Sequence, residues 1–166
     1  IGILGLGRVG RSLSQKLLSI GSPVIFYNDL KKKNTGKSLI YKNKNFIFKN
    51  CDVICITLPE TNKTIGLLNK KIFKIMKKNS FLINTSRGDI INERDLLLML
   101  KKDYFSGVAL DVFNREPYDG DLRKFKRCIM TPHVASHTID CRNRMELEAT
   151  ENLINYFNGD KILFKL

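Results

Sequence analysis

Short apolar runs alternate with segments of helical character along most of the chain. The apolar runs predict strands at 1–4, 24–27, 46–48, 53–57, 81–84, 105–110 and 128–130. The segments between them predict helices at 11–19, 66–76 and 93–102. Strands that are apolar on both faces and separated by helices are typical of a parallel sheet covered on each side. The pattern therefore predicts an α/β protein with a doubly wound parallel sheet and helices on both faces.

Two segments depart from this alternation. Residues 31–45 are polar and predict a loop where a crossover helix would be expected before the third strand. Beyond Pro132, residues 139–157 predict a long amphipathic helix, with Met145, Ala149 and Leu153 on one stripe and Gly159 as its C-cap.

The length of 166 residues and the hydrophobic content of 43% predict one domain, 1–166, around a single core. The chain begins at Ile1, without a methionine and directly on an apolar run, so we interpret it as part of a longer protein. No apolar run approaches the roughly 20 residues that cross a bilayer. We therefore expect a cytoplasmic protein with no membrane contact.

The formal net charge is +13, but the lysines are spread along the chain and Lys31 to Lys33 form the only run of three. We therefore expect no nucleic-acid partner, although a nucleic-acid-binding module remains an alternative. The four cysteines lack the C-x-x-C spacing of zinc sites and redox dithiols. We interpret them as reduced, packed thiols and predict no metal site.

A glycine-rich turn follows the first strand and opens the first helix, with the sequence Gly5-Leu6-Gly7-Arg8-Val9-Gly10. This is the context that the G-x-G-x-x-G fingerprint of Rossmann folds requires. Gly5 permits the tight turn, Gly7 keeps side-chain atoms away from a pyrophosphate, and Gly10 lets the helix lie close to the strand. The free N–H groups of the helix start favour phosphates. The motif predicts a nicotinamide dinucleotide site.

An acidic residue at the end of the second strand would hold the adenosine ribose hydroxyls. The position eighteen residues beyond Gly10 is Asn28, and the acid follows at Asp29. Either side chain can bind a ribose hydroxyl, whereas Lys31 to Lys33 could attract the 2'-phosphate of NADP. The sequence favours NAD and leaves NADP open.

Three later segments, 84–89, 109–117 and 131–136, each lie just beyond the carboxyl end of a predicted strand, which is where ligands bind in open α/β sheets. With these segments in view, the chain resembles the D-isomer-specific 2-hydroxyacid dehydrogenases over essentially its whole length. The resemblance implies a catalytic set that falls on Arg87, Glu116 and His133.

These residue types suit the reduction of a 2-oxo acid without the resemblance. His133 can donate a proton to the carbonyl oxygen, or accept it in the reverse reaction, as a general acid/base. Glu116 would fix the ring and favour its charged form. Arg87 offers a planar fork that can bind the substrate carboxylate or polarise the carbonyl.

The resemblance further implies cofactor contacts from the phosphate turn, the adenosine end and the nicotinamide end. These contacts fall on Arg8, Val9, Leu58, Pro59, Thr85, Ser86, Arg87, Asp111, His133, Ala135 and Ser136. Asp111 would accept a hydrogen bond from the carboxamide.

The resemblance also implies a homodimer and a second, substrate-gripping lobe that this chain does not contain. We therefore expect a small 2-hydroxy or 2-oxo acid as substrate and little or no turnover from the chain alone. A non-catalytic dinucleotide-binding module is an alternative, although it would have no need of a proton donor. The β-hydroxyacid dehydrogenases open with a similar turn but use a lysine in a later helical domain.

Overall fold

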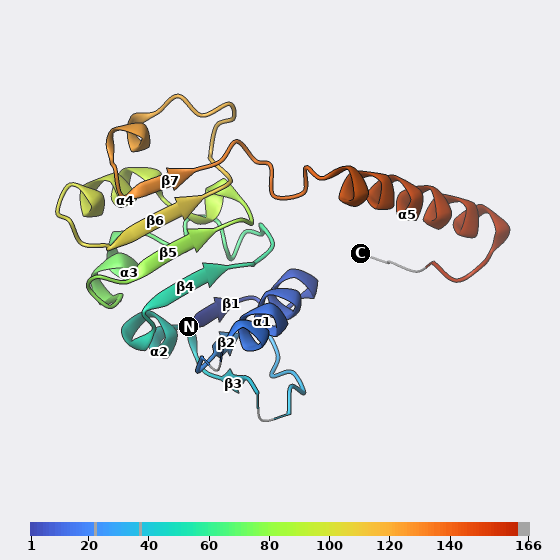
Figure 1. The fold of residues 1–166 in the computed structure, drawn as a ribbon, viewed down its shortest axis with the longest axis horizontal. Helices are drawn as coiled ribbons and strands as arrows, with labels where there is room; N and C mark the ends of the chain where they lie inside the picture. The colour runs from blue at the N-terminus through green and yellow to red at the C-terminus, as the bar shows by residue number, and fades with distance from the viewer. Residues whose placement is uncertain (22, 37, 163–166) are drawn as a thin grey trace. The chain divides into compact units, whose positions relative to one another are not determined.

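The computed structural model describes residues 1–21, 23–36 and 38–162 and contains a seven-stranded sheet (Figure 1). The strands lie in the order β3-β2-β1-β4-β5-β6-β7, and each neighbouring pair is parallel. Their bounds are β1 Gly2–Leu4, β2 Phe26–Asn28, β3 Ile40–Tyr41, β4 Val53–Ile56, β5 Phe81–Asn84, β6 Gly107–Leu110 and β7 Cys128–Met130. The predicted Rossmann-type parallel sheet is confirmed.

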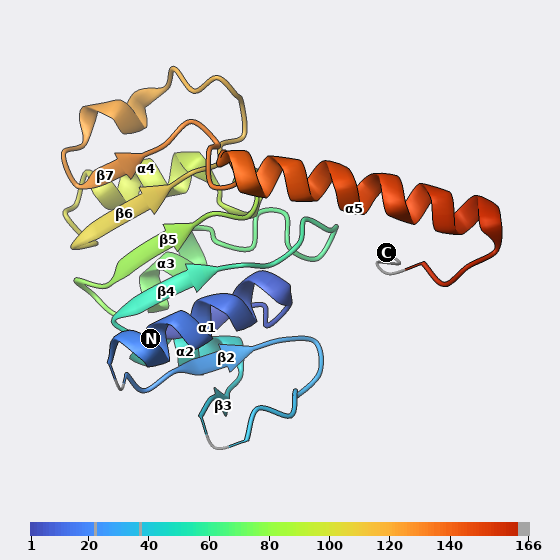
Figure 2. The same cartoon turned by 45° about the vertical axis from the view of Figure 1, so that its right-hand side comes forward.

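Helices cover both faces of this sheet, as Figure 2 shows. One face carries α1, and the other carries α2, α3 and α4 together with two short 3-10 turns, η1 and η2. Their bounds are α1 Arg8–Ile20, α2 Lys44–Asn50, α3 Lys70–Ile75, η1 Gly88–Ile90, α4 Glu93–Leu100 and η2 Asp121–Lys124.

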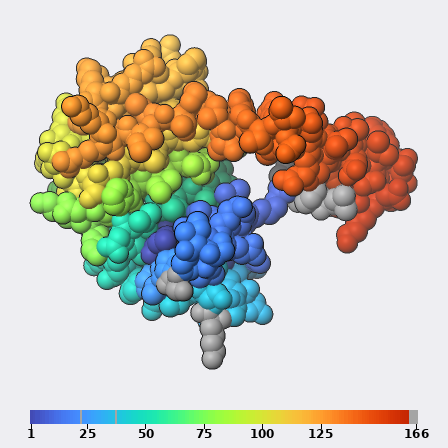
Figure 3. Space-filling model, in the orientation of Figure 1, coloured from blue at the N-terminus to red at the C-terminus, as the bar shows by residue number. Residues whose placement is uncertain are grey.

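Neighbouring residues of β1 point to opposite faces and so belong to different cores. Ile3 packs with Ile25 and Tyr27 against the α1 side, whereas Leu4 belongs to the larger cluster under α2, α3 and α4. Both of these side chains, Ile3 and Leu4, are fully buried, and the face seen in Figure 3 shows only a small dark-blue patch from the start of the chain. Burying each such side chain contributes about 1.5–3 kcal/mol, so this alternation fixes the strand between its two helical layers.

The predicted third strand is wrong. Residues 46–48 lie within helix α2, where Asn43 caps the first turn by accepting from the N–H of Phe46, and Ile47 is buried against the sheet. A three-residue apolar run fits one buried helical turn as well as a short strand, which is why the pattern misled.

The true third strand, β3, lies inside the segment 31–45 that was predicted to be a loop, of which Lys37 is outside the described residues. Its two residues, Ile40 and Tyr41, are apolar but exposed at the sheet edge, and with Leu39 they form an apolar run no longer than the one at 46–48.

The helix predicted from residue 66 begins only at Lys70. Gly66 has a positive φ of 62°, Leu68 forms a bridge to Ile91, and Asn69 caps α3 by accepting from two backbone N–H groups.

Residues 134–166 form a second compact unit, distinct from the unit 1–133. Its helix α5 spans Ile139–Asn158, close to the predicted bounds, and Gly159 ends it with a left-handed φ of 74° as expected. Thr138 caps its start by accepting from the N–H of Cys141. Among the residues that the structure describes, no helix is both long and apolar enough to cross a membrane.

Candidate functional site

The predicted site residues of the first unit follow the carboxyl ends of parallel strands, so they meet at one edge of the sheet. The glycine turn follows β1, Asp29 follows β2, and Leu58 and Pro59 lie just beyond β4. The remaining residues follow the last three strands: Thr85, Ser86 and Arg87 after β5, Asp111 and Glu116 after β6, and His133 after β7. This edge is the usual ligand side of an open α/β sheet.

Two glycines of the turn make close backbone contacts. Gly5 has a φ of 95°, and a Cβ there would lie 2.7 Å from the carbonyl oxygen of Thr57. A Cβ on Gly10 would lie 2.2 Å from the carbonyl oxygen of Gly5. Side chains at either position would therefore push β1, α1 and the end of β4 apart.

Gly7 differs from these two glycines. It caps α1 in an extended conformation, and a Cβ there would have no described heavy atom within 4 Å. The next residues, Arg8 and Val9, are exposed in the first turn of the helix. The protein thus leaves open space at the helix N-terminus, where the partial positive charge of the helix dipole favours a phosphate.

The side chain of Asp29, rather than that of Asn28, binds the glycine turn. One carboxylate oxygen of Asp29 accepts from the N–H of Leu6 at 2.9 Å, and the other accepts from its neighbour Leu30 at 2.6 Å. The side-chain amide of Asn28 instead donates to the carbonyl oxygen of Lys42 at 2.8 Å. The acid that follows β2 is therefore held beside the phosphate turn, although it comes one residue later than the motif leads one to expect.

The loop after β4 supports the turn through its backbone and one hydroxyl. Thr57 donates to the carbonyl oxygen of Gly5 at 2.6 Å, and Pro59 accepts from the hydroxyl of Thr64 at 2.7 Å. Leu58 is half-buried and packs against the larger core.

Asn84, at the end of β5, fixes the segment that carries Arg87. It is fully buried; its amide nitrogen donates to the carbonyl oxygen of Arg87 at 2.9 Å, and its amide oxygen accepts from the N–H and hydroxyl of Ser86. The Arg87 guanidinium is exposed and donates to the carbonyl oxygen of Ser86. Thr85 is exposed beside it. The buried amide thus presents an exposed arginine at the site edge.

His133 and Glu116 form a direct pair. His133 Nδ1 lies 2.8 Å from Glu116 Oε2, and Glu116 Oε1 accepts from the N–H of Phe113 at 3.0 Å. The hydrogen bond to His133 is the main cause that lowers the pKa of Glu116, and the Phe113 N–H lowers it further. Glu116 is thus a carboxylate at neutral pH, and it is Nδ1 of His133, not Nε2, that contacts this carboxylate.

Asp111 lies between the β5 and β7 ends. It is buried, and one oxygen accepts from the hydroxyl of Thr131 at 2.6 Å, while its N–H donates to the carbonyl oxygen of Asn84. Asp111 therefore connects Asn84, which precedes the Arg87 segment, to Thr131, which precedes His133: the first through its backbone N–H and the second through its carboxylate.

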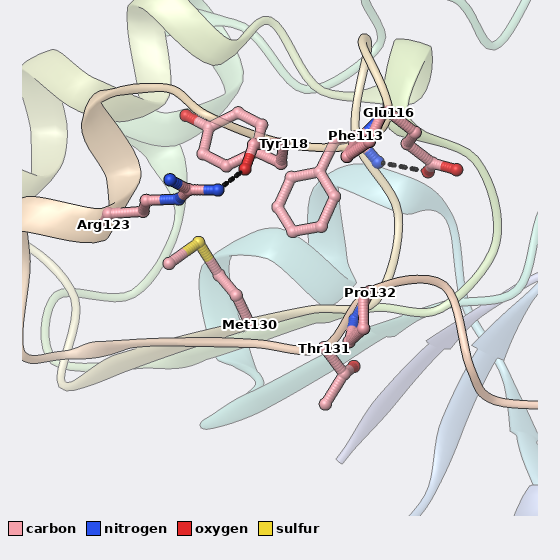
Figure 4. A pocket seen from close by; sticks show the side chains of 8 residues that line it. Phe113, Glu116, Tyr118, Arg123, Met130, Thr131 and Pro132 are labelled. Atoms are coloured by element: carbon pink, nitrogen blue, oxygen red, sulfur yellow. Dashed lines mark hydrogen bonds between the residues drawn. The ribbon is translucent and has the colours of Figure 1, made fainter.

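A cavity of about 700 Å³ adjoins the His133–Glu116 pair. Figure 4 shows the rings of Phe113 and Tyr118 on one side, Met130 on the other, and Arg123 and Glu116 at its ends. The two rings stack with their centroids 4.4 Å apart.

Sequence reasoning missed several residues of this edge. Glu93 and Tyr118 carry no motif of their own, and Asn84 and Thr131 begin two of the segments noted in the sequence but were given no role there. A buried polar residue ending an apolar strand, as Asn84 does, is the one signal that could have been noticed. Ala135 and Ser136, which were also predicted, belong to the second unit and are exposed and half-buried there.

Comparisons with known proteins identify a matching family, similar sequences and similar solved structures. Residues 1–135 match the family described as D-isomer specific 2-hydroxyacid dehydrogenase, NAD binding domain. Glyoxylate reductases from Thermofilum pendens and Thermococcus litoralis are 34% and 33% identical, each over 96% of this chain. The solved NAD-dependent formate dehydrogenase from Staphylococcus aureus in complex with NAD is 29% identical, with a TM-score of 0.86 over 99% of this chain and 49% of that chain. The chain spans about half the length of the curated relatives it matches, 49% in both reductases.

Proposed function

The chain belongs to the D-isomer specific 2-hydroxyacid dehydrogenase family as an NAD-binding domain, and from this premise we propose that it carries the proton-transfer and cofactor-binding residues of an enzyme that interconverts 2-hydroxy and 2-oxo acids. The observation that supports this most directly is the 2.8 Å contact between His133 and Glu116 at the same sheet edge as the glycine turn. A module that only senses a dinucleotide has no use for such a pair.

The residues present fit a nicotinamide dinucleotide. The open space at Gly7 and the positive end of the α1 dipole suit a pyrophosphate, and the Asp29 carboxylate beside Leu6 suits ribose hydroxyls. Arg8 and Val9 would lie at the phosphates, Leu58 and Pro59 at the adenosine, and Thr85, Ser86, Asp111, Ala135 and Ser136 toward the nicotinamide end. When bound, NAD supplies hydride transfer to or from C2 of the acid.

His133 would supply the proton. In the direction of reduction, Nε2 donates a proton to the carbonyl oxygen of the 2-oxo acid as C2 gains hydride, and the product is a 2-hydroxy acid. The reverse direction returns the proton to Nε2. Glu116, bound to Nδ1, orients the ring and balances the positive charge that the ring carries before transfer.

Arg87 would bind the substrate carboxylate. Its guanidinium is exposed on a segment that buried Asn84 holds in place, so it can meet a small anion in two parallel hydrogen bonds. The substrate class is therefore a small acid with an oxygen at C2. We propose that a second lobe completes the grip on this acid and that the whole protein forms a homodimer.

Calorimetric titration of the chain with NADH, and separately with NADPH, tests the cofactor part of the proposal. We expect NADH to bind more tightly, because the negative Asp29 meets ribose hydroxyls favourably and a 2'-phosphate unfavourably. Asp29→Asn keeps the bond from Leu6 but loses the charge, so NADH binding should weaken about tenfold and the preference over NADPH should narrow.

Asp52→Asn is the matched control. It removes the same charge from an exposed acid that precedes β4, at the opposite edge of the sheet, and it should leave both affinities unchanged. A folded chain that binds neither dinucleotide, or that instead binds generic DNA with a steep salt dependence, would contradict the proposal.

A further inference from the structure

The segment that carries Glu116 is an irregular loop between β6 and η2. Glu116 itself is exposed, with 37% of its side-chain surface open to solvent, and the peptide that follows it is cis. Regular secondary structure therefore does not hold the carboxylate toward His133. Side-chain contacts from elsewhere must do so.

Tyr118 supplies three such contacts. Its ring stacks on Phe113 at 4.4 Å and 23°, its hydroxyl donates to Glu93 Oε1 at 2.7 Å, and the same hydroxyl accepts from the N–H of Leu122 at 3.1 Å. Burial raises the pKa of Tyr118 to about 12, so the phenol keeps its proton in the range where enzymes work. Glu93 is the first residue of α4, so the loop is tied to a regular helix.

The two residues that carry the stacked rings lie on either side of Glu116 in the sequence. Phe113 precedes it by three residues and donates its N–H to Glu116 Oε1, and Tyr118 follows it by two residues. The same loop is tied to the Arg87 segment, because the side chain of Asn114 donates to Asp89 Oδ1. A shift of Tyr118 would therefore move Phe113. Its N–H makes one of the two hydrogen bonds that orient the Glu116 carboxylate.

We infer that Tyr118 is a positioning residue, which sets the Glu116 carboxylate against His133 through its stack on Phe113 and its hydrogen bond to Glu93. This inference deepens the proposed function and rests on it. Tyr118 exchanges no proton with the substrate in this role. Its hydroxyl acts only through the loop.

The test measures the pKa of the Glu116 carboxyl by carbon-13 NMR in the chain labelled at glutamate, with and without Tyr118→Phe. The titratable groups that act on Glu116 are His133 and Asp111, and the charged or titratable groups around Tyr118 are Glu93, Arg123 and Cys128. Tyr118→Phe alters none of these charges. We expect the pKa of Glu116 to rise by about 0.5, which is about a threefold loss of preference for the carboxylate.

Tyr104→Phe is the matched control, because the Tyr104 hydroxyl also donates to a buried acceptor, the carbonyl oxygen of Met76 at 2.7 Å. It should cost similar stability and leave the pKa of Glu116 unchanged. Glu93→Gln keeps an oxygen that accepts from Tyr118, so the pKa of Glu116 should again stay unchanged. Glu93→Leu removes this acceptor and should raise the pKa of Glu116 as Tyr118→Phe does.

The outcomes separate the two ideas. A pKa of Glu116 that is already at its ordinary value in the unchanged chain would argue against the His133 pair, and so against the proposed function. A lowered pKa that Tyr118→Phe leaves in place, or that Tyr104→Phe raises equally, would overturn the positioning role alone.

Discussion

The glycine turn and the loops around His133 lie at the same edge of the sheet but are built in opposite ways. The turn works through missing side chains: Gly5 and Gly10 let backbones touch, and Gly7 leaves space open. The loops depend on hydrogen bonds between side chains, such as the one between Glu116 and His133. A substitution therefore harms the turn by adding atoms and the loops by removing partners.

The largest expected effect is on the loop side. His133→Asn removes the proton donor, so the full-length enzyme should lose activity by about a factor of 100 to 10,000, whereas NADH affinity should fall far less. Turnover of 2-oxo acids and calorimetry would measure the two quantities. His137→Asn, which changes the other, exposed histidine, should keep full activity. Equal losses in both variants would remove His133 from its proposed role.

On the turn side, Gly10→Ala should destabilise the fold itself. Its Cβ would meet the Gly5 carbonyl oxygen at 2.2 Å, so we expect a loss of about 2–3 kcal/mol despite a helix-propensity gain of about 1 kcal/mol. Urea denaturation measures the loss. Gly21→Ala meets no described atom within 4 Å and should stay close to neutral. A stable Gly10→Ala chain would mean that α1 can move away from β1.

Gly7→Val sharpens the comparison, because it should spare the fold and weaken only binding. Gly7 is extended and its missing side chain faces open space, so the urea midpoint should hold. NADH affinity should fall at least about tenfold, which is about 1.4 kcal/mol. Gly21→Val is the control for binding. Unchanged NADH affinity would show that the phosphates do not approach this turn.

The smallest effect concerns pH. The folded pKa of Glu116 is lowered by its bond to His133, so Glu116 contributes stability that is complete above the ordinary glutamate pKa of about 4.3. That contribution is lost as pH falls through the folded value. Because the side chain is over a third exposed, we expect well under 1 kcal/mol. Glu116→Gln should flatten this part of the stability curve, and an unaltered curve would contradict the pair.

The parallel sheet could be predicted from sequence because buried strands such as β4 and β5 are continuous apolar runs. The family could also be predicted, from the order of the motifs. The match of residues 1–135 to that family confirms the prediction. Edge strand β3 could not be predicted, since Ile40 and Tyr41 form a short apolar run inside an otherwise polar segment. The run 46–48 was misread because one buried helical turn and a short strand look alike.

The candidate site divides in the same manner. Motifs locate Arg87, Glu116 and His133, whose catalytic roles stay predictions, because each follows a strand at a fixed place in the order. Their supports, Asn84 and Tyr118, are chosen by which segments the fold brings together. Tyr118 meets Glu93 across 25 positions of sequence, and no local spacing encodes that meeting.

The open space beside Gly7 has a consequence for how damage to this protein would appear in a cell. A chain altered at Gly10 unfolds more often, so quality control would lower its abundance. A chain altered at Gly7 keeps its core, so quality control would not remove it. It would accumulate at normal levels with weakened NADH binding, so abundance and cofactor binding would report on two different glycines only three residues apart.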